Sequence, residues 1–168
     1  MDPGSIRVEP LASIHDRAAF SCGVPALDRY LREQAGQDAK RRVAAPFVAL
    51  DPNGRLIGFY TLSATSIQMA ELPPELAKRL PRYPRLPATL LGRLATDTSA
   101  RGIGLGRFLL VDAMFRTLRS EIASFAFVVD AKDEAAAAFY KREGLIPLPD
   151  TPGRLVRRMT DIASLFDP

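Results

Sequence analysis

The feature that most constrains the fold is a glycine-rich segment, Arg101 to Gly106, which lies between an apolar strand-like run and an apolar helical run. Glycines at alternate positions remove Cβ atoms where backbone amides must approach an anion closely. The positive end of the following helix dipole points to the same place. The segment predicts a strand, a pyrophosphate-binding loop and a helix in that order, with the loop formed by Arg101, Gly102, Ile103, Gly104, Leu105 and Gly106.

Other phosphate-binding loops fit this segment less well. A P-loop places Lys and then Ser or Thr after its last glycine, whereas Arg107 and Phe108 follow Gly106. A dinucleotide-binding fingerprint requires a glycine at Arg107 or at Leu109, and neither position has one. The spacing resembles instead the Arg/Gln-x-x-Gly-x-Gly/Ala signature of the GNAT N-acetyltransferases, which binds the pyrophosphate of coenzyme A.

Length and composition predict one domain, residues 1–168, because 168 residues with 47% hydrophobic content suffice for a single core. No apolar run has the length of a membrane span, and no basic region leads into an apolar stretch at the N-terminus, so a cytoplasmic protein with no membrane contact is expected. A single cysteine, Cys22, and a single histidine, His15, cannot build a disulfide or a zinc site, and no metal is expected.

The apolar periodicity predicts an α/β fold with a central mixed sheet and helices on both faces. The turn Asp51 to Gly54 contains Asn53-Gly54, which is expected to supply the positive φ angles of a tight hairpin. Strands are expected at Ile6 to Val8, Phe47 to Leu50, Leu56 to Ile67, Thr89 to Thr96, Ser124 to Val129 and Leu155 to Met159. Helices are expected at Ala26 to Arg42, at Glu75 to Leu80, after the glycine loop with Phe108, Val111, Phe115 and Leu118 on one face, and at Asp133 to Arg142.

The order of these elements predicts where a ligand extends from the loop. Parallel strands that separate at their carboxyl ends leave a crevice, here between the strand that ends near Thr96 and the strand Ser124 to Val129. Buried backbone groups need hydrogen-bond partners. Those of Leu94, Ala95 and Thr96 are therefore expected to pair with the amides of a pantetheine arm.

The last predicted helix supplies a candidate acid. Asp133, Ala136 and Tyr140 recur at helical spacing, so small alanines leave a groove beside the tyrosine, whereas Phe139 is expected to turn toward the core. Acetyl transfer from a thioester to an amine requires an acid for the departing thiolate, and a phenol has an ordinary pKa near about 10, close to that of a thiol. The predicted cofactor site comprises Leu94, Ala95, Thr96, Arg101, Gly102, Ile103, Gly104, Leu105, Gly106, Asp133, Ala136, Phe139 and Tyr140, with Tyr140 as the catalytic acid.

Arginines cluster in a stretch that is also rich in proline. Pro73 to Pro87 holds five of the 14 prolines together with Arg79, Arg82 and Arg85. Proline stiffens the chain, so a rigid surface excursion is expected. With Arg93, these cations could line one rim of the active-site mouth and contact RNA phosphates; a solvated loop explains any single arginine equally well.

Particular segments resemble the acetyltransferase toxins of type II toxin–antitoxin modules, and the resemblance covers nearly the whole chain. It implies the GNAT fold, with a central mixed, mostly antiparallel sheet splayed at an acetyl-CoA crevice. Thr96 and Leu145 depart mildly from the usual valine and phenylalanine, which affects the expected geometry more than the activity. The segments are Phe20 to Gly23, Leu27 to Leu31, Gly58 to Ser63, Leu80 to Pro84, Leu91 to Ala95 and, for the end of the GNAT core, Ala131 to Leu145.

The resemblance also implies substrates and partners. The donor would be acetyl-CoA and the acceptor the α-amino group of an aminoacyl-tRNA, whose acetylation stops translation. A homodimer would be neutralised by a ribbon-helix-helix antitoxin, and the complex would bind operator DNA. Tyr140 would be the acid, and Arg93 with neighbouring basic residues would contact the tRNA. Two alternatives stay open: an N-acetyltransferase for a small-molecule amine or a protein N-terminus or lysine, and a GNAT-like module that binds a partner without catalysis.

Overall fold

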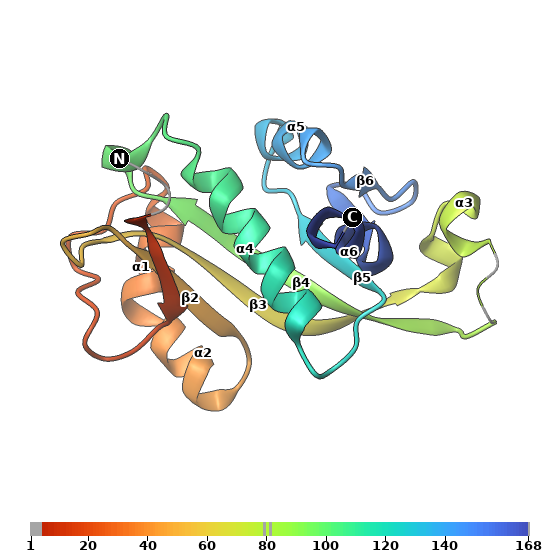
Figure 1. The fold of residues 1–168 in the computed structure, drawn as a ribbon, viewed down its shortest axis with the longest axis horizontal. Coiled ribbons are helices and arrows are strands. Elements are labelled where there is room, and N and C mark those ends of the chain that lie inside the picture. Colours follow the sequence, from red (N-terminus) through yellow and green to blue (C-terminus); the bar gives the residue numbers. More distant parts are fainter. Residues whose placement is uncertain (1–4, 79, 81, 168) are drawn as a thin grey trace. The chain divides into compact units, whose positions relative to one another are not determined.

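The computed structural model describes residues 5–78, 80 and 82–167. Seven strands occur in these residues, in the sheet order β1-β2-β3-β4-β5-β7-β6, together with six α-helices (Figure 1). The chain divides into two compact units, one of residues 1–63 with 92–113 and the other of residues 64–91 with 114–168. Strands β3 and β4 and helix α4 contribute residues to both units. The mixed, mostly antiparallel α/β fold predicted from the sequence is confirmed.

The first unit contains the elements that carry the glycine loop, and three of these elements continue into the second unit. They are β1 (Arg7–Pro10), α1 (Pro25–Glu33), α2 (Ala35–Arg41), β2 (Ala45–Leu50), β3 (Leu56–Gln68), β4 (Arg85–Thr96), the 3-10 turn η3 (Thr98–Ala100) and α4 (Leu105–Arg119). The other elements, in the second unit, are η2 (Met69–Glu71), α3 (Pro74–Ala77), β5 (Ala126–Asp130), α5 (Glu134–Arg142), β6 (Ile146–Pro147), β7 (Arg154–Arg158) and α6 (Met159–Phe166).

The predicted hairpin joins β2 to β3, which pair antiparallel, but its turn differs from the prediction. Gly54 has a φ of +81°, whereas Asn53 keeps a negative φ. The Asp51 carboxylate explains the difference, because its Oδ1 accepts from the N–H groups of Asn53 and Arg55, each at 2.9 Å. An aspartate that satisfies two backbone donors locally replaces the mirror-image turn expected for Asn-Gly.

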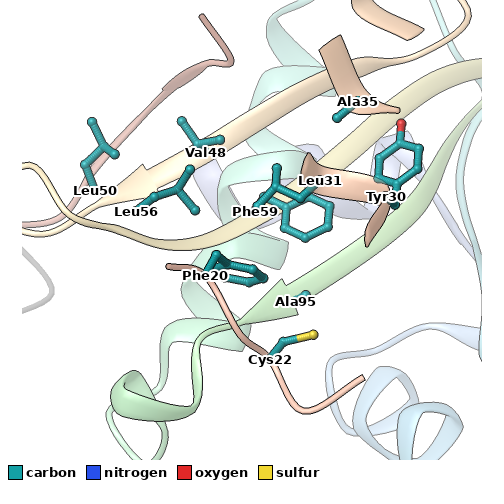
Figure 2. Close-up of a cluster of buried hydrophobic side chains, with 10 residues drawn as sticks. All are labelled: Phe20, Cys22, Tyr30, Leu31, Ala35, Val48, Leu50, Leu56, Phe59 and Ala95. Atoms are coloured by element: carbon teal, nitrogen blue, oxygen red, sulfur yellow. The ribbon is translucent and has the colours of Figure 1, made fainter. Parts of the chain in front are cut away.

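Helices cover both faces of β3 in the first unit. The Phe59 ring stacks with Tyr30 of α1 at 6.2 Å between centroids, within a buried cluster (Figure 2). The residues on either side of Phe59 contact the opposite helix. The Tyr60 hydroxyl donates to Asp112 Oδ2 of α4 at 2.5 Å, and a Cβ added at Gly58 would lie 2.9 Å from a methyl carbon of Leu109. The alternation follows from the two-residue period of a strand.

The single helix predicted over Ala26 to Arg42 is wrong, because two helices, α1 and α2, occupy this range. Gln34 lies between them with φ −123° and ψ −34°. A continuous helix would pair the Leu31 carbonyl with the N–H of Ala35. Here the guanidinium Nη1 of Arg17 donates to that carbonyl at 3.0 Å. A side chain fourteen positions away thus satisfies the group that would have continued the helix.

Helix α4 buries a different face from the one that periodicity singled out. The face with Phe108, Val111 and Leu118 is half-buried, and Phe115 is 37% exposed. Because α4 is apolar on most sides, its sequence alone does not select the buried face; the close approach at Gly58 does. The buried residues are Leu105, Leu109, Leu110, Ala113, Met114 and Thr117.

The second unit contains the predicted buried strand. Ala126 to Val129 of β5 are all 0% exposed. They pair in parallel with β4, from Ala88 to Leu91, and antiparallel with β7. β4 begins at Arg85, four residues before the predicted start, and α3 is shorter than the helix expected over Glu75 to Leu80. Helix α6 was not predicted from the sequence. In the described parts of the chain, no helix combines the length and apolarity needed to cross a membrane.

Candidate functional site

The segment Arg101 to Gly106 follows η3, and α4 begins within it at Leu105. The loop is therefore shorter than predicted, because Leu105 and Gly106 already belong to the helix. Gly102 has a φ of +80° and Gly104 a φ of +78°, values at which an L side chain is strained. A Cβ built on either glycine would meet no atom within 4 Å, so the loop is open on this side. Positive φ at alternate positions is typical of backbone nests, whose N–H groups bind anions, and the N-terminus of α4 adds its dipole. These features fit a pyrophosphate.

Leu94, Ala95 and Thr96 end β4 immediately before this turn. Ala95 is buried, whereas Leu94 and Thr96 are half-buried. Leu105, which begins α4, is only 2% exposed, and its side chain therefore belongs to the core. Its backbone position at the helix N-terminus is what keeps Leu105 in the candidate site. Ile103 and Gly106 are half-buried.

Arg101 was predicted as a cation for the phosphate, and in the structure its guanidinium makes a hydrogen bond to the backbone. The Nη2 group donates to the carbonyl oxygen of Cys22 at 2.9 Å. A Cβ added at Gly23, which has a φ of +88°, would lie 3.0 Å from that nitrogen. The glycine therefore leaves room for the guanidinium. Arg101 ties the start of the glycine loop to the segment that precedes α1.

Asp97 lies four residues before the candidate loop and was not singled out from the sequence. Its side chain accepts from the N–H of Ser21 at 3.0 Å, and from the N–H and hydroxyl of Ser99 at 2.9 and 2.7 Å. Arg55 Nη2 lies 3.4 Å from the same carboxylate. Burial acts to raise the pKa of Asp97, but these hydrogen bonds and the arginine charge outweigh it and lower the pKa. An Asp two residues before a Ser, at the end of a strand, was the available signal.

Tyr140 lies on α5, whose predicted ends are confirmed. The Asp133 side chain caps the helix by accepting from the N–H of Ala136 at 2.8 Å, and Gly144 has a φ of +91° after the last turn. Tyr140 is 8% exposed, and its hydroxyl makes no hydrogen bond within the described part of the chain. Burial raises the pKa of Tyr140 to about 12. The phenol is therefore protonated at neutral pH.

Phe139 lies beside this phenol rather than deep in the core. Its ring is half-buried and meets the ring of Tyr140 edge-on, with 5.2 Å between centroids. Ala136 is also half-buried. An edge-on aromatic pair restrains the orientation of both rings. Phe139 thus supports the position of Tyr140 on the helix.

The predicted RNA-binding arginines occupy different places. Arg93 lies on β4, and its guanidinium stacks over the ring of Tyr30 on α1 with 3.6 Å between Cζ and the ring centroid, a cation–π contact. Arg82 and Arg85 are exposed. Arg93 belongs to the first unit and the other two to the second. Arg79 lies outside the described residues.

The predicted cofactor residues also divide between the units. The first unit holds those from Leu94 to Gly106, and the second holds Asp133, Ala136, Phe139 and Tyr140. Within each unit, these residues have the burial, φ angles and hydrogen bonds described above. Among the described residues, no group of three or more His, Cys, Asp or Glu side chains could hold a metal ion.

Two glycines with positive φ just before a helix suit the binding of a pyrophosphate, and a buried phenol on a later helix suits the protonation of a leaving thiolate. The sequence model of the acetyltransferase (GNAT) family matches residues 11–145, and this range includes residues of both units. The chain belongs to the GNAT family of acetyltransferases.

Two relatives match this chain over nearly its full length. A tRNA-acetylating toxin of Mycobacterium tuberculosis (strain ATCC 25618 / H37Rv) is 34% identical over 158 residues, 93% of each chain. A probable toxin TacT of Sinorhizobium fredii (strain NBRC 101917 / NGR234) is 30% identical over 170 residues, 95% of this chain and 94% of the relative.

Solved structures of AtaT are similar to this chain over nearly its full length. AtaT complexed with acetyl-methionyl-tRNAfMet has a TM-score of 0.89 at 28% identity, covering 96% of this chain and 99% of AtaT. AtaTR bound with acetyl-CoA has a TM-score of 0.84 at 28% identity, covering 97% and 99%. A mutant AtaT toxin bound to the C-terminus of the antitoxin AtaR has a TM-score of 0.84 at 26% identity, covering 98% and 99%.

Proposed function

We propose that this chain is a toxin acetyltransferase. It transfers the acetyl group of acetyl-CoA to the α-amino group of an aminoacyl-tRNA and thereby blocks translation. The observation that carries the proposal is the similarity, over 93% of both chains, to a tRNA-acetylating toxin. The positive φ angles of Gly102 and Gly104, which prepare an anion-binding loop before α4, support acetyl-CoA as the donor.

The donor binds through the first unit. The N–H groups of the glycine loop and the N-terminus of α4 hold the pyrophosphate. Backbone groups of Leu94, Ala95 and Thr96 pair with the pantetheine amides, as β-strand residues do with an added strand. β4 is suited to this because it continues to Thr96, five residues beyond its parallel pairing with β5 at Leu91.

Tyr140 acts as the general acid. The amine nitrogen attacks the thioester carbonyl carbon, the carbon–sulfur bond breaks, and the Tyr140 hydroxyl donates its proton to the departing sulfur. The attacking amine loses its own proton to solvent. The pKa of an α-amine is about 8, so a fraction of the amine is neutral at cellular pH without a protein base. The raised pKa of Tyr140 keeps the phenol protonated for this role.

The acceptor is contacted by arginines. Arg79, Arg82, Arg85 and Arg93 bind phosphates near the acceptor end of the tRNA. Arginine suits this task because its planar guanidinium donates in pairs. Stacking of Arg93 on Tyr30 supports its assignment, since the contact holds the cation without using its charge in an ion pair. Affinity that rests on such contacts falls steeply with salt.

The partners follow from the same class of protein. The enzyme is neutralised by an antitoxin, of the ribbon-helix-helix type, and the complex binds operator DNA. The active form is a cytoplasmic homodimer, and both units of each chain form one catalytic domain, residues 1–168. The AtaT structure with the C-terminus of AtaR supports an antitoxin. A single unfolding transition for both units would support one domain.

Incubation with labelled acetyl-CoA and a pool of charged tRNAs tests the function. Label is expected on the aminoacyl group of tRNA, released as an N-acetyl amino acid by mild alkali. Label found only on polyamines, peptide N-termini or lysines would contradict aminoacyl-tRNA as the acceptor. The absence of any transfer would contradict the proposed acetyltransferase activity. Wild type is expected to arrest growth when expressed without antitoxin, and Tyr140→Phe is not.

A further inference from the structure

Three hydrogen bonds join the turn before the glycine loop, and Arg101 at the start of the loop, to two successive residues of the N-terminal segment. These residues, Ser21 and Cys22, are called the brace. Asp97 Oδ2 accepts from the Ser21 N–H at 3.0 Å, and the Thr98 N–H donates to the Ser21 carbonyl at 2.9 Å. Arg101 Nη2 donates to the Cys22 carbonyl at 2.9 Å. The brace precedes its partner Asp97 by 76 positions in the chain.

The brace is itself firmly placed. Phe20 and Cys22 are 3% and 6% exposed, and both belong to the buried cluster that includes Ala95 near the end of β4 (Figure 2). The N–H of Cys22 donates to Asp28 Oδ1 of α1 at 2.9 Å. Side-chain burial and backbone hydrogen bonds therefore fix the brace from two sides.

The glycine loop lacks comparable support on its own surface. A Cβ at Gly102 or Gly104 would meet no atom within 4 Å, so packing at these two positions does not hold the loop. The helix end of the loop is held where the Phe108 N–H donates to the Gly104 carbonyl at 3.0 Å. At the strand end, Asp97 and Arg101 tie the chain to the brace.

We propose that Asp97 is a positioning residue for the acetyl donor's pyrophosphate. Its carboxylate fixes the turn before the glycine loop on the brace, and the loop N–H groups are thereby kept directed at one anion site. Arg101 contributes through the Cys22 carbonyl. This inference rests on the proposed function, because it assigns the loop to acetyl-CoA, and it extends the donor site to residues that do not touch the donor.

The direction of the effect distinguishes positioning from charge. If the Asp97 carboxylate acted on the anion through its charge alone, its removal would relieve repulsion and strengthen binding of acetyl-CoA. If it acts by holding the turn, its removal weakens binding, because preorganised donors become free to move. The two roles therefore predict opposite changes for Asp97→Asn.

The experiment compares two acetyl donors. Asp97→Asn keeps the shape of the side chain, and acetyl-pantetheine keeps the thioester but lacks the pyrophosphate. We expect kcat/KM for acetyl-CoA to fall about tenfold, mainly through KM, as for one lost charge-assisted hydrogen bond. For acetyl-pantetheine it should stay within about twofold of wild type. Asp51→Asn is the matched control, since Asp51 also accepts two backbone N–H groups in the same unit; its ratio between donors should equal that of wild type.

An equal loss with both donors would overturn the proposal, because it would reflect general damage to the fold. Unchanged or stronger use of acetyl-CoA would overturn it as well. Should Asp97→Asn fail to fold, Ser99→Ala is the second variant, because it removes only the hydroxyl that lies 2.7 Å from Asp97. It must lower kcat/KM for acetyl-CoA in the same donor-selective way, but by less. The absence of a donor-selective loss in Ser99→Ala would also overturn the proposal.

Calorimetric titration with coenzyme A and with pantetheine separates this inference from the proposed function, because it needs no acceptor. If wild type fails to acetylate aminoacyl-tRNA while Asp97→Asn still weakens coenzyme A binding selectively, the acceptor assignment is wrong and the role of Asp97 stands. If Asp97→Asn leaves coenzyme A affinity unchanged while aminoacyl-tRNA is acetylated, the role of Asp97 is wrong and the function stands.

Discussion

Replacing Tyr140 by phenylalanine tests the proposed chemistry with little disturbance to the fold. The substitution removes one oxygen and leaves the ring in its edge-on contact with Phe139. Because the hydroxyl makes no hydrogen bond within the described residues, its loss leaves no partner unsatisfied. We therefore expect the free energy of unfolding to change by less than about 1 kcal/mol.

The expected loss of activity follows from the proton transfer. General acid catalysis contributes about 10²- to 10⁴-fold. Burial raises the pKa of Tyr140 from 10.0 to about 12, so the phenol is a weaker acid than a free tyrosine by about 3 kcal/mol. A weaker acid gives a smaller contribution, and we expect kcat to fall about 10²- to 10³-fold, with KM for acetyl-CoA changed less than about threefold.

The pH dependence gives an independent measurement. The acid must be protonated, and with a pKa of about 12 it stays so as pH rises through 10. We expect the wild-type rate to show no descending limb between pH 8 and about 10.5. An amide-linked aminoacyl-tRNA analogue is the suitable acceptor, since the natural ester hydrolyses in alkali. A descending limb centred near pH 10, or a Tyr140→Phe variant with wild-type kcat, would refute the reasoning.

Three further outcomes are expected. Gly58→Ala should lower the free energy of unfolding by about 1–3 kcal/mol in urea titrations, because its Cβ would lie 2.9 Å from Leu109, and wild-type stability would contradict this packing. Gly104→Ala should weaken acetyl-CoA binding about tenfold in calorimetric titrations, since the φ of +78° is strained for alanine; undiminished affinity would exclude the loop. Burial raises the pKa of Tyr30 and Tyr140 to about 12, so the folded chain binds more protons than the unfolded one above pH 10, and the free energy of unfolding should fall between pH 10 and 12; a flat profile would contradict these values.

Local patterns were enough to predict most of the strands and the fold class. The continuous apolar run before Asp130 became the buried strand β5, and Asp133 and Gly144 bounded α5 as expected. The errors arose where a distant group decided the local structure. Arg17 ended α1 at the Leu31 carbonyl, and the close approach at Gly58 selected the buried face of α4. Neither contact has a signature within the helix concerned.

The candidate site shows the same division. Two of the loop's glycines could be identified from their spacing, and their positive φ angles agree with that prediction. Asp97 was not predicted because its hydrogen bond with the Ser21 N–H joins distant parts of the chain, and the periodicity of apolar residues gives no sign of such a bond. The hydrogen bond from Arg101 to the Cys22 carbonyl was hidden for the same reason, since its partner is a backbone group.

The two units interleave along the chain, and this has a consequence for synthesis. The first unit needs residues 92–113 to follow 1–63, and the second resumes at 114 after supplying 64–91. No single cut separates the two units from each other. The ribosome therefore synthesises the brace and the glycine loop before residues 114–168, which include Tyr140. Contacts so distant in sequence also slow folding. Under the proposed mechanism, a chain that has not yet reached residue 140 lacks its general acid.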